Sequence, residues 1–167
     1  FSVFTPYKNA WLGRLTPSDL QAYPIDRYAD ALALPPPDLT GPIPALEAMG
    51  FRRTNLKALR IGTGMSAGAA LFADFRERID RYREARDFPA AKGPSYLSVH
   101  LRFGTVSVRE LVAYAHLRSL EKDGEGAATW LSELIWREFY AQILWHHPRV
   151  VAHAFRPQYD ALRFPDD

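Results

Sequence analysis

The stretch from Trp130 to Tyr140 contains no helix breaker and combines large aromatic side chains with acids and an arginine. At about 100° per residue, one helical face collects Trp130, Glu133, Arg137 and Leu144, with Trp136 and Tyr140 at its edge. The opposite face carries the ordinary core residues Leu131, Ile135 and Phe139. A surface helix normally has a solvated face opposite its apolar face. Here aromatic rings bracket a carboxylate and a guanidinium, so the pattern predicts a helix that is also a pocket wall.

A simpler interpretation of the same residues stays open. Glu133 and Arg137 stand four residues apart with the acid first, which is the favoured order for an intrahelical ion pair worth about 0.2–0.5 kcal/mol. Trp130 and Trp136 would then be ordinary core residues, since tryptophan is highly buried on average. The remainder of the chain must decide between the two interpretations.

Composition excludes several classes of protein. Of 167 residues, 47% are hydrophobic and 24% charged, which predicts an ordered globular chain. There is no cysteine, so disulfides, thiolate nucleophiles and zinc–sulfur sites are impossible. No apolar run approaches the roughly 18 residues that span a membrane, and no signal peptide opens the sequence. We therefore expect a cytoplasmic protein. Basic residues concentrate at 52–60 and 76–86, which allows a phosphate-facing surface.

The first 43 residues differ in character from the others. Residues 1–5 alternate apolar and small polar side chains, which predicts a short strand interrupted by Pro6. Residues 9–15 have enough apolar positions for a short helix. Residues 16–43 are rich in proline, including Pro35–Pro37, and have no sustained period, so they predict an extended connector. Its apolar side chains indicate that the connector lies on a surface; they are Tyr23, Ile25, Tyr28, Leu32 and Leu34.

From about residue 66 onward the pattern is helical, and one further short helix is expected before it. A short helix over residues 44–49 should end at Gly50, and Ser66 is a candidate cap for a longer helix that runs to Tyr82 and ends before Pro89. Residues 95–104 read as a loop that leads into a short helix. Ser107 is the candidate N-cap of a helix over 108–120, and the aromatic helix covers 127–146. The body is predicted to be all-α.

Two motifs suggest chemistry that their context does not support. Residues 62–68 have the spacing GxGxxxG, but no convincing strand precedes them, so a connector with a helix cap is the better interpretation. His146 and His147 precede a proline at a helix end and have no acidic or cysteine partner at metal spacing. We predict no metal site, and no serine stands in a nucleophile elbow.

Four segments together resemble the photolyase/cryptochrome family of flavoproteins. They are residues 4–11 (FTPYKNAW), 86–89 (RDFP), 95–104 (SYLSVHLRFG) and 133–140 (ELIWREFY). Their order and spacing agree with the family over nearly the whole chain, and they are most similar to bacterial class I cyclobutane pyrimidine dimer photolyases. The resemblance implies three parts: the end of an α/β antenna domain at 1–15, an interdomain linker at 16–65, and the first half of a helical FAD-binding domain at 66–167.

The resemblance also implies roles for individual residues. The FAD-contacting positions would be Tyr82, Pro94, Ser95, Tyr96, Leu97, Ser98, Trp130 and Arg137. The positions facing damaged DNA would be Arg86, Glu133, Trp136 and Tyr140, with Glu133 as the catalytic residue. Backbone N–H groups around Ser95 and Ser98 would cradle the pyrophosphate, and Arg137 would add a cationic fork. Trp136 would lie against a flipped-out lesion, and Glu133 would stabilise charge that appears on it.

Two departures bear on these roles. Pro94 stands where the family often has threonine and cannot donate an N–H, and Tyr96 stands where the family often has a basic residue. The resemblance further implies that an antenna domain with a folate or deazaflavin chromophore precedes residue 1 and that the second half of the FAD domain follows residue 167. We therefore expect the isolated chain to be inactive and to bind FAD weakly or not at all.

Three functions remain as hypotheses. The first is light-driven repair of cyclobutane pyrimidine dimers by electron transfer from reduced FAD, in a monomer whose partner is ultraviolet-damaged DNA and which sits on the nucleoid when bound. The second is a blue-light photoreceptor of the cryptochrome type. Retention of Glu133 and Trp136 favours repair, because a sensor does not need a lesion-contacting pair. The third is a helical scaffold whose aromatic helix is only core.

Overall fold

Helices and single turns provide the regular secondary structure of this computed structural model, which describes residues 1–59 and 61–163. The α-helices are α1 (Phe4–Arg14), α2 (Pro17–Leu20), α3 (Gly64–Arg76), α4 (Tyr82–Ala85), α5 (Ser98–Phe103), α6 (Val108–Ser119) and α7 (Glu125–His146). The 3₁₀ turns are η1 (Ile25–Ala31), η2 (Pro37–Leu39), η3 (Glu47–Met49), η4 (Leu56–Leu59), η5 (Ile79–Arg81), η6 (Pro148–Val151) and η7 (Pro157–Ala161). No strand occurs in the described ranges, and the all-α prediction for the body is confirmed.

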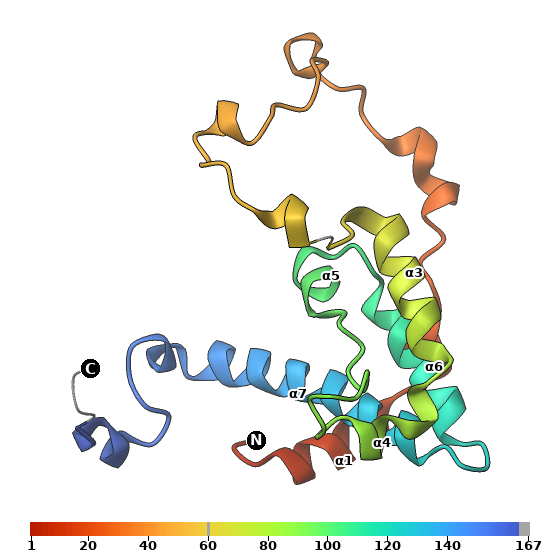
Figure 1. Ribbon diagram of the computed structural model, residues 1–167, viewed down its shortest axis with the longest axis vertical. Helices are drawn as coiled ribbons and strands as arrows, with labels where there is room; N and C mark the ends of the chain where they lie inside the picture. The colour runs from red at the N-terminus through yellow and green to blue at the C-terminus, as the bar shows by residue number, and fades with distance from the viewer. Residues whose placement is uncertain (60, 164–167) are drawn as a thin grey trace.

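Helix α7 is the scaffold of the body, and α1, α4, α6 and η5 pack along it (Figure 1). Its buried side chains include Leu131, Leu134, Ile135 and Phe139, which follow the helical period. Burying each such side chain contributes roughly 1.5–3 kcal/mol. Near its start, α7 approaches η5 so closely that a Cβ at Gly126 would lie 2.2 Å from the carbonyl oxygen of Ile79. Only glycine permits this approach, so Gly126 sets the crossing of the two elements.

Helix α6 forms as its sequence predicts. Ser107 has an extended backbone, and its hydroxyl accepts a hydrogen bond from the N–H of Glu110 at 3.4 Å, so the predicted N-cap is confirmed. Leu111, Val112 and Ala115 recur at helical spacing and are buried against the core. The cap fixes where α6 begins, and the buried residues fix which face of α6 is turned toward the core.

The helix predicted from Ser66 to Tyr82 is wrong in its boundaries. Helix α3 begins at Gly64, with Ser66 inside it, and ends at Arg76. The backbone of Arg78 then leaves the helical region, with φ −135° and ψ 5°, before η5 and α4 resume. This break turns the side chain of Arg78 toward the loop at residues 92–94, while Ile79 and Tyr82 remain buried.

The strand predicted at residues 1–5 is also wrong. Helix α1 begins at Phe4 and includes Pro6, which stands in the first helical turn, where the missing N–H has no intrahelical acceptor to lose. A five-residue alternation fits the start of a helix as well as a strand. Packing decides between them, because Phe4, Tyr7 and Trp11 lie against the core beside α7.

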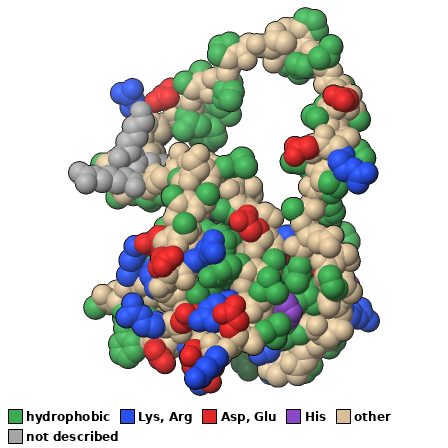
Figure 2. Space-filling view, turned by 90° about the vertical axis from the view of Figure 1, so that its right-hand side faces the viewer, with side chains coloured by type: hydrophobic (Ala, Val, Ile, Leu, Met, Phe, Trp, Pro, Cys, Tyr) green, Lys and Arg blue, Asp and Glu red, His purple; other side chains and the backbone are tan. Residues whose placement is uncertain are grey.

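Residues 21–59, which we call the arm, project from the body as a wide loop (Figure 1). Their regular structure consists of the 3₁₀ segments η1 to η4. The connector predicted at residues 16–43 is therefore not extended throughout, because it contains α2 and the seven-residue η1. The expectation that its apolar side chains lie on a surface is met at Tyr23, which contacts Arg109, and is wrong for Ile25, Tyr28, Leu32 and Leu34. Tyr23, Ile25, Tyr28, Leu32 and Leu34 are all exposed, Leu34 at 91%. Figure 2 shows hydrophobic side chains along the arm with open space between it and the body.

Contacts of Arg109 on α6 fix the base of the arm. Its guanidinium donates to the carbonyl of Asp19 at 2.6 Å and to the hydroxyl of Tyr23 at 2.5 Å, and it lies over the Tyr23 ring. The arm therefore leaves the body in a defined direction. In the described residues, no helix combines the length and apolar content needed to cross a membrane.

Candidate functional site

The residues predicted to contact a cofactor come together around one hollow of about 310 Å³. We call it the α4–α7 hollow, because α4, α7 and the loop between residues 93 and 98 enclose it. It is lined by Tyr82, Pro94, Ser95, Tyr96, Leu97, Ser98, Leu101, Trp130, Glu133, Leu134 and Arg137. Residues up to 55 positions apart in sequence thus share one site, which helical periodicity alone does not require.

The α7 wall of the hollow follows from helical spacing. Trp130, Glu133, Leu134 and Arg137 recur every three or four residues and so face the same side. Trp130 is almost completely buried and packs against the ring of Phe75, with 4.8 Å between centroids. Trp130 is therefore a core residue that also lines the hollow. The core and the pocket-wall interpretations are both correct for this side chain.

The opposite wall is a loop with an unusual backbone. Tyr96 has a positive φ of 57°, which is uncommon for a residue that carries a Cβ. Leu97 follows with φ −83° and ψ 2°, and its N–H donates to the hydroxyl of Ser95 at 3.4 Å. In the part of the chain that the structure describes, the N–H groups of Tyr96 and Ser98 donate to no other residue. Alternating signs of φ turn successive N–H groups toward one side, the arrangement that binds anions.

Glu133 makes an ion pair with the end of α4, not along its own helix. Its Oε1 lies 2.5 Å from Nη1 of Arg86 at the end of α4, and the ion pairs of the described residues do not include Glu133 with Arg137. The guanidinium of Arg86 also lies 5.4 Å from the centroid of the Tyr82 ring. The hydrogen bond to Glu133 raises the pKa of Arg86, and burial raises the pKa of Tyr82. Arg86 thus holds the Glu133 carboxylate at the rim of the hollow.

Arg137 has a different environment. It is exposed, and within the described ranges it takes part in no ion pair. It lines both the α4–α7 hollow and a neighbouring one of about 220 Å³ beside Trp11 and Glu138. A guanidinium at a rim without a carboxylate partner is available to an anionic ligand.

Trp136 and Tyr140, predicted to face DNA, do not line the hollow. The Trp136 ring stacks on Phe4 of α1 with 3.6 Å between centroids and 8° between planes, and it also stacks on Tyr140. Tyr140 is mostly exposed. Trp136 therefore joins α1 to α7, a packing role that agrees with the simpler interpretation of this tryptophan, and the DNA contact stays a prediction.

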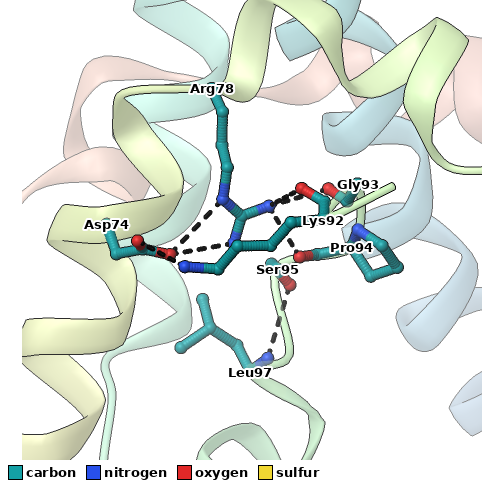
Figure 3. A network of polar contacts seen from close by, with 7 residues as sticks. All are labelled: Asp74, Arg78, Lys92, Gly93, Pro94, Ser95 and Leu97. Carbon is teal, nitrogen blue, oxygen red and sulfur yellow. Dashed lines mark hydrogen bonds and ion pairs between the residues drawn. The ribbon is translucent and has the colours of Figure 1, made fainter. Parts of the chain in front are cut away.

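Sequence reasoning missed the residues that support the loop wall. Asp74, Arg78 and Lys92 form a network with the carbonyl groups of residues 92–94 (Figure 3). The acid-first spacing of Asp74 and Arg78 was visible in the sequence, but the same spacing at Glu133 and Arg137 gives no ion pair. A larger hollow of about 700 Å³ is lined by Asp74, Lys92 and His100 among others, and it shares Tyr96 and Ser98 with the α4–α7 hollow.

The chain is similar to known proteins over almost its whole length. It is 32% identical to the deoxyribodipyrimidine photo-lyase of Halobacterium salinarum over 174 residues, which cover 100% of this chain and 35% of that protein. The protein of the same name from Vibrio cholerae is 36% identical over 90% of this chain and 31% of its own length. The one from Escherichia coli is 32% identical over 92% of this chain and 31% of its own length.

The chain thus spans about a third of the length of the curated relatives that it matches. No protein-family model matches it, and no solved structure matches it.

Proposed function

Because this chain belongs to the DNA photolyase family, we propose that it supplies one wall of an FAD site and a lesion contact in a light-driven DNA-repair enzyme. The observation that carries the proposal is the α4–α7 hollow, which unites the positions implied for the cofactor and brings Glu133 to its rim. The activity named for the relatives belongs to proteins about three times as long, so the proposal concerns the chain within such a protein.

The residues of the hollow fit the chemistry of FAD. The cofactor joins flat aromatic ring systems to a diphosphate, and so it needs apolar surface and anion-binding groups in one place. The hollow offers the edges of Tyr82 and Trp130 as apolar surface, the free N–H groups of Tyr96 and Ser98, and the unpaired guanidinium of Arg137. Pro94 contributes no N–H, so Tyr96 and Ser98 would carry the backbone contacts.

The chemistry that reduced FAD supplies when bound is light-driven electron donation to a pyrimidine dimer, and the protein supplies geometry and electrostatics. Glu133 would hydrogen-bond the dimer and stabilise the charge that appears on it. Arg86 would hold the Glu133 carboxylate in place before the lesion arrives, so that no reorganisation is needed. This role for Arg86 differs from the direct DNA contact expected from the sequence.

Trp136 would present its remaining free edge to a lesion that is flipped out of the duplex. Its stacking on Phe4 and Tyr140 would keep that edge in one orientation. Because the stack on Phe4 already occupies a ring face, an edge contact with the lesion would contribute less than the roughly 1–3 kcal/mol of a full base–aromatic stack.

A hybrid protein tests the proposal. This chain would replace the aligned segment of the photo-lyase from Escherichia coli, and the purified hybrid would be assayed for bound flavin and for repair of a dimer-containing oligonucleotide. We expect bound flavin and repair under illumination but not in the dark. A folded hybrid that binds flavin but repairs nothing in the light would contradict repair and favour the photoreceptor function. A folded hybrid without flavin would contradict the cofactor site.

A further inference from the structure

Arg78 makes the densest set of polar contacts beside the α4–α7 hollow, although it does not line the hollow itself. Its side chain is 11% exposed. Its Nη1 lies 2.8, 3.0 and 2.8 Å from the carbonyl oxygens of Lys92, Gly93 and Pro94, three consecutive residues of the loop wall (Figure 3). A single cation therefore fixes the peptide planes that lead into the strained part of the loop.

Asp74 orients the Arg78 guanidinium and also binds the loop directly through Lys92. Its Oδ2 accepts from Nε and Nη2 of Arg78 at 3.3 and 3.1 Å, and its Oδ1 accepts from Nζ of Lys92 at 2.7 Å. Figure 3 shows the Asp74 carboxylate facing both Arg78 and Lys92 from α3. Because Arg78 is planar and presents its donors in a fixed fork, a lysine could not hold the acid and three carbonyls together.

The same guanidinium reaches the strained residue of the loop. It lies 5.9 Å from the centroid of the Tyr96 ring and 5.0 Å from that of Phe75. A non-glycine residue with positive φ persists only when its surroundings hold it. On the far side of the loop, Gly93 is so close to α4 that a Cβ would lie 2.4 Å from the carbonyl oxygen of Ala85. The loop is thus held between α4 and Arg78.

We propose that Arg78 is a positioning residue for the cofactor site: together with Asp74 it holds residues 92–96 so that the N–H groups of Tyr96 and Ser98 face the hollow. The proposal rests on the proposed function, since it concerns affinity for FAD. Without Arg78, Tyr96 can relax to negative φ, which rotates its neighbouring peptide groups and removes the anion-binding arrangement. Arg78 acts through the loop and touches no ligand.

The test begins with loop mobility in the 167-residue chain. Trypsin can cut after Lys92 only if the loop opens, and cutting after Arg137, in the middle of α7, reports global unfolding in the same digest. We expect Arg78→Gln to speed cleavage after Lys92 at least about tenfold, because it removes the guanidinium that binds three loop carbonyls and the net loss of one charge-assisted hydrogen bond alone gives such a factor. Arg78→Lys should give an intermediate rate. Arg83→Gln is the matched control, because it removes an exposed cation that pairs with Glu125 and does not touch the loop.

The second arm measures FAD dissociation from the hybrid described above. Arg78→Gln should weaken FAD about tenfold, Asp74→Asn should weaken it less, and Arg83→Gln should not change it. Leu111→Ala on α6 lowers global stability without touching the loop, so it should leave FAD affinity unchanged. That comparison separates positioning from a merely structural role.

Four outcomes would overturn the proposal. Unchanged cleavage after Lys92 in Arg78→Gln would show that Arg78 does not hold the loop. Equal loss of FAD in Arg78→Gln and Leu111→Ala would show that the effect is general instability. Unchanged FAD affinity in Arg78→Lys and Asp74→Asn, with faster loop cleavage, would show that the loop does not serve the cofactor. If the unsubstituted hybrid binds no FAD, the proposed function fails first, and this proposal fails with it.

Discussion

The helical body and the arm are built from the same kinds of apolar residue and have opposite fates. In the body, Phe75, Ile79, Leu97, Leu111 and Ile135 are inaccessible to solvent or nearly so. In the arm, Leu34 is 91% exposed and Ile43 is 95% exposed. The difference lies in spacing, because the body repeats its apolar residues at helical intervals whereas the arm interrupts them with proline. Hydrophobicity alone therefore does not decide burial.

The two regions also differ in what fixes them. The body is held by side chains buried around α7. The arm is held by Arg109 at its base and by short 3₁₀ segments, of which η1, η2 and η3 bury none of their own residues. Each arm residue that is ordered loses chain entropy and gains little burial in return. Substitutions should therefore be costly in the body and almost neutral in the arm.

The largest expected difference comes from removing one apolar side chain in each region. Ile135→Ala should lower the free energy of unfolding by about 2–5 kcal/mol, since it leaves a cavity in the core. Leu34→Ala should change it by less than about 0.5 kcal/mol. Urea unfolding of both variants measures the contrast. Similar losses in the two variants would show that the arm is packed in solution.

A smaller contrast uses two glycines. Gly126→Ala should cost about 1–3 kcal/mol, because the added methyl group meets the backbone of η5. A Cβ at Gly41 in the arm meets nothing within 4 Å, so Gly41→Ala should be neutral or slightly stabilising. Thermal unfolding of the pair tests this, and a stable Gly126→Ala variant would argue against the close crossing of α7 and η5.

The smallest contrast concerns helix starts. Ser107→Ala should lower stability by about 1 kcal/mol, the usual worth of an N-cap hydrogen bond. Thr63 stands at the N-cap position of α3, and its side chain makes no cap hydrogen bond, so Thr63→Ala should have an effect near zero. Chemical denaturation of both variants decides, and an equal cost at the two positions would contradict the difference between the caps.

The sequence predictions succeeded where the deciding interactions are local in sequence and failed where they join residues far apart. Helices α6 and α7 were predictable because period, cap and stop signals all lie within one segment, as at Ser107 and Pro148. The start of α1 was not predictable, because it depends on the contact between Phe4 and Trp136, which are more than 130 residues apart in sequence. The break at Arg78 was missed for the same reason, since its side chain binds carbonyls of residues 92–94.

The candidate site shows the same limit. The family motifs identified the residues of the hollow, and the structure brings them together. Which charges pair could not be foreseen. Asp74 and Arg78 realise their four-residue spacing as an ion pair, whereas Glu133 finds Arg86, 47 positions earlier in the chain. Local spacing gives each arginine a candidate partner, and tertiary packing chooses among the candidates.

The division of α7 between cofactor and lesion is the central claim, and the hybrid enzyme tests it most directly. Flavin content and repair yield per absorbed photon would be measured for Glu133→Ala and for Arg137→Ala. We expect Glu133→Ala to keep its flavin and lose repair yield, because its carboxylate acts once charge reaches the dimer, and Arg137→Ala to lose flavin. A Glu133→Ala variant that loses its flavin and repairs normally with the flavin that remains would contradict this division.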